Sequence, residues 1–116
     1  MENLLLTKDC TLKICDFGEC YVPGQFEDTR IPGTPIYRAP DKDLTKPLVD
    51  SYSSGIVAFM MCTGEFPFLD YDDDSYKEFH ADPIKMAEER GLEVSPELLT
   101  MVAGLTHHDI KKRFDL

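Results

Sequence analysis

Residues 3–18 read NLLLTKDCTLKICDFG, and this stretch decides the fold of the N-terminal part of the chain. Leucine occupies positions 4–6, Thr-Lys-Asp follows at 7–9, and polar and apolar residues alternate over 11–15. An alternation of period two is typical of a β-strand, and residues 7–9 have the composition of a turn. Residues 1–16 are therefore predicted to form a β-hairpin.

A candidate metal site lies at one end of this hairpin. Asp16 directly follows the second predicted strand, and Gly18 would let the backbone turn sharply behind it. Asn3 lies 13 residues before Asp16, so strand pairing would bring its amide oxygen to the same end as the carboxylate. Hard oxygen ligands of this kind suit Mg²⁺, which binds few protein ligands together with substrate phosphates. For Asn3, an ordinary turn role is the alternative.

A long loop and a helical region follow the hairpin. Residues 18–35 contain three glycines and three prolines and are predicted to be a loop, which at this length is usually functional or disordered. Helices are predicted over about residues 50–63 and 75–90, and the first of them is apolar on most sides and should be buried. A third helix follows. The start and stop signals are Gly64, Gly91, Ser95 and Pro96. The predicted class is α+β, mostly α, because strands occur only at the beginning.

Composition limits the classes of partner. The net charge of −10 argues against nucleic acid and anionic membrane as partners, since both need a basic face. No signal peptide or membrane-spanning stretch is visible, and the expected location is cytoplasmic, with the nucleus as an alternative. Four cysteines without zinc-finger spacing are expected to be reduced thiols. The expected partner is a protein, either a substrate or a regulator.

Six segments in order make the chain resemble the protein kinase family, in which a catalytic loop ends in Asn before a strand and a second strand leads to D-F-G. The first two segments are those around Asn3 and Asp16. The others resemble G-T-x-x-Y-x-A-P-E, D-x-W-S-x-G, G-x-x-P-F and D-P-x-x-R, and here they are residues 33–41, 50–55, 64–68 and 109–113.

The resemblance implies a mostly helical C-lobe and a role for each matched residue. Asn3 and Asp16 would hold the Mg²⁺ that bridges the phosphates of ATP, and Cys15 would border the adenine pocket. Phe17 would pack beneath the site and report active or inactive states. Thr34 would line the site of the substrate hydroxyl and favour serine or threonine substrates. The implied activation segment comprises Phe17, Gly18, Thr29, Gly33, Thr34, Tyr37, Ala39, Pro40 and Asp41.

Three further positions have implied structural roles. Asp50 would tie the start of the long helix to the catalytic-loop backbone, or else act as a helix N-cap. Gly55 would belong to that same helix. Arg113 would form a buried ion pair with Asp41, or else lie in a solvated run of basic residues. Asp41 stands where the family has Glu, so the pair is expected to be strained or bridged by water.

The departures from the family affect the predicted activity. The catalytic base of H-R-D is expected upstream of Met1, and the ATP-pairing lysine and the glycine-rich loop are absent. Residues 1–116 are therefore interpreted as a partial serine/threonine kinase domain, inactive by itself and binding ATP and Mg²⁺ weakly or not at all. The alternative is a non-catalytic interaction module or a truncated remnant. Thr29 is the nearest candidate for activating phosphorylation, although it is one residue out of register.

Overall fold

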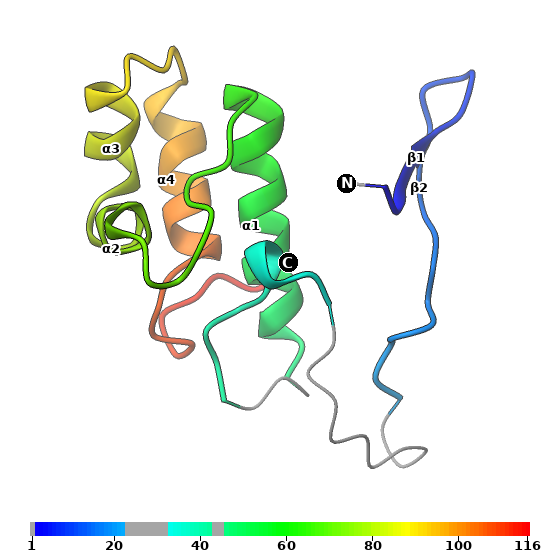
Figure 1. Ribbon diagram of the computed structural model, residues 1–116. Coiled ribbons are helices and arrows are strands. Elements are labelled where there is room, and N and C mark those ends of the chain that lie inside the picture. Colours follow the sequence, from blue (N-terminus) through cyan, green and yellow to red (C-terminus); the bar gives the residue numbers. More distant parts are fainter. Residues whose placement is uncertain (1, 23–32, 43–45) are drawn as a thin grey trace. The chain divides into compact units, whose positions relative to one another are not determined.

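The computed structural model describes residues 2–22, 33–42 and 46–116 (Figure 1). These residues form two compact units, Met1–Gly33 and Thr34–Leu116. The first unit contains two short strands, and the second contains four α-helices and a short 3₁₀ helix. The predicted class, α+β and mostly α, is confirmed.

The first unit contains the predicted β-hairpin. Strands β1 (Leu4–Leu6) and β2 (Leu12–Ile14) pair in antiparallel fashion, with Leu4 opposite Ile14. The turn is closed by side chains, because the hydroxyls of Thr7 and Thr11 donate to the two carboxylate oxygens of Asp9 over 2.6 and 3.1 Å. Short polar side chains that bond their neighbours in this way stabilise turns.

Helix α1 (Leu48–Thr63) begins two residues before the predicted start and ends where predicted. Gly64 adopts a φ of 75°, and its N–H donates to the carbonyl of Met60, which is the usual left-handed end of a helix. The expectation that most of its sides are buried was wrong at its C-terminal end. Ile56 and Phe59 are buried, whereas the side chain of Met61 is 67% exposed.

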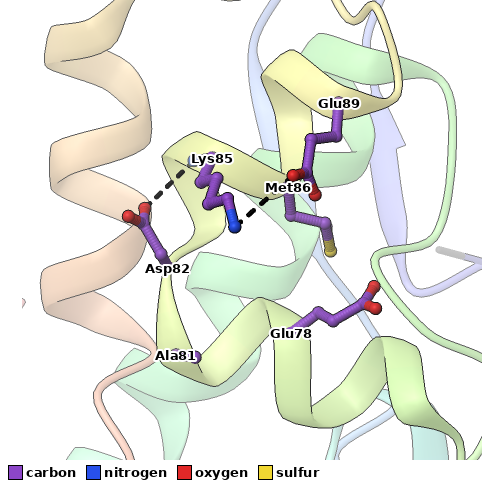
Figure 2. Close-up of a pocket in the computed structure, with 6 residues that line it drawn as sticks. All are labelled: Glu78, Ala81, Asp82, Lys85, Met86 and Glu89. Atoms are coloured by element: carbon purple, nitrogen blue, oxygen red, sulfur yellow. Dashed lines mark hydrogen bonds and ion pairs between the residues drawn. The ribbon is translucent and has the colours of Figure 1, made fainter.

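The single helix predicted over residues 75–90 is two helices, α2 (Asp74–Ala81) and α3 (Pro83–Glu89). Proline has no N–H for the helical ladder and its ring clashes with the preceding turn, so α2 cannot continue through Pro83. Asp82 caps the new helix by accepting from the N–H groups of Ile84 and Lys85 over 3.1 and 3.0 Å. Figure 2 shows Asp82 at this junction and the ion pair of Lys85 with Glu89 beside it, around a pocket that Met86 also lines.

Helix α4 (Pro96–Leu105) begins as predicted, with the Ser95 hydroxyl accepting from the N–H of Leu98 over 3.3 Å. It packs against both α1 and α3 (Figure 1). The core of the second unit comprises Ala39, Tyr52, Ile56, Phe59, Phe68, Phe79, Met86, Ala87, Leu99 and Val102. Among the residues described, no helix is both long and apolar enough to cross a bilayer.

Candidate functional site

The hairpin brings Asn3 to the same end as Asp16. The N–H of Cys15 donates to the carbonyl of Asn3 over 3.0 Å, which extends the strand pairing by one step and places Asn3 beside the residue preceding Asp16. Both side chains are exposed, and Cys15 is half-buried. An amide oxygen and a carboxylate are therefore available at one open end of the hairpin, and both are ligand types that Mg²⁺ prefers.

The sharp turn after the hairpin occurs at Asp16 itself. Asp16 has a φ of 62°, in the left-handed region that few residues other than glycine adopt, whereas Gly18 has no positive φ. The sharp turn predicted from Gly18 therefore lies at Asp16 instead. A Cβ built on Gly18 would lie 3.4 Å from Oδ1 of Asp16, so the carboxylate lies close to the backbone of Gly18. The side chain of Phe17, expected to pack beneath the site, is 65% exposed.

The other end of the implied activation segment is described from Gly33 onward, and Thr29 lies outside the described residues. Gly33 has a φ of 81°, and its N–H donates to the Glu19 carboxylate over 2.7 Å. Thr34 is exposed and directly precedes the 3₁₀ helix η1 (Pro35–Tyr37). The Thr34 hydroxyl caps no helical N–H, so its side chain is available to other groups.

Residues 34–41 lie against the helical body and are held there by side chains. Ser53 on α1 donates its hydroxyl to the carbonyl of Tyr37 over 2.8 Å. The hydroxyl of Tyr71 donates to the carbonyls of Pro35 and Arg38. Ala39 is buried in the core, and Pro40 is half-buried. Sequence reasoning had not singled out Ser53 or Tyr71 as individual residues, although Ser53 is the serine of the D-x-W-S-x-G-like segment.

Asp41 and Arg113 form an ion pair at the end of this segment. Nη1 of Arg113 lies 2.6 Å from Oδ2 of Asp41, and the two side chains are 0% and 11% exposed. The contact is direct, so the shorter side chain of aspartate does not separate the pair. Arg113 also donates to the carbonyls of His107 and Leu48, and its guanidinium lies 5.2 Å from the ring centroid of Tyr52. Arg113 therefore links residue 41 to the start of α1 and to the segment after α4.

Asp50 and Gly55 have different environments on α1. The N-cap position is occupied by Pro47, so the alternative of Asp50 as N-cap is wrong, and Asp50 is an exposed residue of the first turn. Gly55 is buried where α1 meets the end of α4. A Cβ at that position would lie 2.6 Å from Cγ2 of Thr106 and 2.9 Å from Cβ of Leu105, closer than real contacts allow. Gly55 is thus required by the packing of the two helices.

A half-buried histidine, His80, lies close enough to Arg113 to feel its charge. Nδ1 of His80 lies 2.8 Å from the carbonyl of Tyr76, which can only accept, so Nδ1 carries the proton. Nε2 is then free to accept from the hydroxyl of Tyr52, 2.9 Å away. Burial lowers the pKa of His80 and raises that of Tyr52, so both groups are neutral at physiological pH. His80 was not singled out by the sequence.

The stability of the helical unit should therefore fall in mild acid. Because the pKa of His80 is lowered by folding, the unfolded chain binds its proton first. Stability is then lost as pH falls below the ordinary histidine pKa of about 6.5. Urea unfolding between pH 7.5 and pH 5 should show this slope in the wild type. The slope should be smaller in His80→Gln. An equal slope in His80→Gln would contradict the assignment.

Among the residues described, no three side chains of His, Cys, Asp or Glu lie close enough together to form a metal centre. The adjacent His107 and His108 do not form one, and Nδ1 of His107 accepts from the N–H of Asp109. The four cysteines are free thiols. A metal ion at Asn3 and Asp16 would thus have two protein ligands, and its other ligands would come from elsewhere.

Comparison with known proteins gives the same family along the whole sequence. Residues 1–116 match the protein kinase domain. The chain is 37% identical over 121 aligned residues to RAC-beta serine/threonine-protein kinase B of Xenopus laevis, covering 97% of this chain and 24% of that protein. It is 32% identical over 124 residues to serine/threonine-protein kinase GRIK2 of Arabidopsis thaliana, covering 99% of this chain and 30% of that protein. The chain thus spans 24–30% of the length of these relatives.

Proposed function

Because the chain belongs to the protein kinase family, we propose that it carries the metal-ligand pair and the substrate-positioning segment of a serine/threonine kinase domain. The proposed reaction of the whole protein is the transfer of phosphate from ATP to serine or threonine of a protein substrate, in the cytoplasm. The proposal depends on one observation above all, the hydrogen bond from Cys15 to Asn3 that brings Asn3 to the same end of the hairpin as Asp16.

The residues at this end of the hairpin fit the divalent cation that the family implies. Asn3 and Asp16 offer oxygen ligands, and both side chains are exposed. A bound Mg²⁺ would neutralise the charge that develops on the phosphates during transfer. Thr34, exposed beside η1, would meet the hydroxyl of the substrate. The 116 residues include no H-R-D segment, ATP-pairing lysine or glycine-rich loop, so we propose that they do not transfer phosphate by themselves.

The metal proposal can be tested without measuring activity, with Mn²⁺ as a paramagnetic probe of the Mg²⁺ site in the full 116-residue chain. We expect Mn²⁺ at millimolar or lower concentration to broaden the amide NMR signals of Asn3 and Asp16, and this broadening to disappear in Asp16→Ala. The acidic residues Asp70, Asp72 and Asp74 provide an internal control, since any broadening there should be the same in both chains. Equal broadening at Asn3 in the wild type and Asp16→Ala would contradict the proposal.

A second candidate function is a non-catalytic protein-binding module. The exposure of apolar side chains on the hairpin favours it, because Leu5, Leu6, Leu12 and Ile14 are each 50–67% exposed. Exposed apolar surface of this kind often marks a protein contact. Calorimetric titration with Mg·ATP separates the two candidates. Saturable binding that Asp16→Ala removes would favour the kinase role, and no binding together with a cooperative thermal unfolding would favour the module.

A further inference from the structure

The backbone of η1 is fixed by side chains from the helical body. The Tyr71 hydroxyl donates to the carbonyls of Pro35 and Arg38, and the Ser53 hydroxyl donates to that of Tyr37 between them. None of the residues of η1 is itself fully buried. Ile36 and Tyr37 pack against the core while only partly buried, so the polar anchors act together with this apolar contact in setting the position of η1.

Tyr71 is well suited to act as an anchor. Its ring packs against Phe68 and, edge-on, against Tyr76, with centroids 6.3 and 5.3 Å apart. Its own N–H donates to the carboxylate of Asp70 over 2.6 Å. Ring and backbone are therefore both held, so the hydroxyl reaches the two carbonyls without loss of further side-chain freedom. Partial burial raises the pKa of the hydroxyl, which stays protonated and able to donate at neutral pH.

Tyr71 lies in the turn before α2, 36 residues after Pro35 and 33 residues after Arg38. It therefore ties together two segments that are distant in sequence. The match to the family extends over both segments, but the family-like motifs 33–41 and 64–68 do not include position 71. A single hydroxyl hydrogen is shared between the two carbonyl oxygens, so its removal weakens both contacts at once.

We propose that Tyr71 is a positioning residue for the protein substrate. It holds the backbone at residues 35–38 and, through it, the adjoining Thr34, so that a serine- or threonine-bearing segment meets a fixed surface. The inference rests on the proposed function for the identity of the substrate. The positioning itself is a property of the chain that can be measured without nucleotide.

The test is hydrogen exchange of the full 116-residue chain, followed at the amides of Tyr37 and Arg38. These amides report on η1 because they donate to the carbonyls of Thr34 and Pro35 over 3.1 and 2.9 Å. We expect Tyr71→Phe to speed their exchange by about tenfold, as the loss of a hydroxyl donor shared by two acceptors implies. The amides of α4 should exchange at the wild-type rate. Tyr76→Phe is the matched control, since it removes a hydroxyl from the neighbouring ring, and it should leave η1 unchanged.

A restored donor separates positioning from general support of the fold. Replacement of Tyr71 by 4-aminophenylalanine puts two N–H donors at the same place on the ring and should return the exchange of η1 to within about threefold of the wild type. Three results would overturn the inference: no change at η1 in Tyr71→Phe, an equal rise across α4, or no recovery with 4-aminophenylalanine. These outcomes are independent of the Mn²⁺ experiment, so failure of the positioning role and failure of the proposed function can be told apart.

Discussion

Asp41→Asn should lower the free energy of unfolding of the helical unit by about 3–5 kcal/mol, the usual result of removing one partner from a buried ion pair. The guanidinium of Arg113 would stay behind with its side chain fully buried and its charge unpaired. None of the residues that the structure describes accepts a hydrogen bond from another of its nitrogens, Nη2. The carbonyls of His107 and Leu48 stabilise the cation in part but do not neutralise it.

Urea unfolding followed by circular dichroism measures this effect. Glu89→Gln is the control, since it removes one partner of the exposed Lys85–Glu89 ion pair and should cost less than about 1 kcal/mol. The double variant Asp41→Asn/Arg113→Met should recover part of the loss, because it leaves no buried charge without a partner. A loss in Asp41→Asn no larger than in Glu89→Gln would show that the buried pair contributes little.

Gly55→Ala should destabilise the same unit by about 1–3 kcal/mol, the typical cost of overpacking a core. The new methyl group would overlap Cβ of Leu105 and Cγ2 of Thr106. Both of these residues are buried at the end of α4, so neither can move away without shifting the helix. The helical preference of alanine, worth up to about 1 kcal/mol over glycine, offsets only part of this cost.

Gly104→Ala provides the matched comparison on α4. Its Cβ would overlap the ring of Phe114, at distances of 2.1–2.6 Å, but that side chain is 52% exposed and can rotate away. The substitution should therefore be nearly neutral or slightly stabilising. Thermal unfolding of both variants should separate them clearly. Equal stability of Gly55→Ala and Gly104→Ala would show that the close approach of α1 to α4 is not constrained as the structure indicates.

The sequence predicted those features that depend on neighbours in the chain. The hairpin follows from its alternation, and the ends of α1 and α4 follow from Gly64, Ser95 and Pro96. The break between α2 and α3 was missed, although Asp82 and Pro83 form the same kind of start signal as Ser95 and Pro96. The apolar pattern that continues past Pro83 concealed it.

The features that depend on distant contacts could not be read from residue patterns. Arg113 belongs to a run of basic residues, and only the fold shows that it is buried while Lys111 and Lys112 are exposed. The match to the family did suggest its partner, Asp41. For Tyr71 no local pattern indicates that its hydroxyl reaches carbonyls more than thirty positions away. The same holds for His80, whose protonation state follows from two contacts on opposite sides of its ring.

The left-handed backbone of Asp16 has a consequence for selection. At a φ of 62° glycine would be energetically favoured, because for most other residues this conformation costs about 1–2 kcal/mol. A chain selected for the stability of its hairpin alone would tend to replace Asp16 by glycine and lose the carboxylate. Under the proposed Mg²⁺ role of Asp16, ligand chemistry outweighs folding stability at this position.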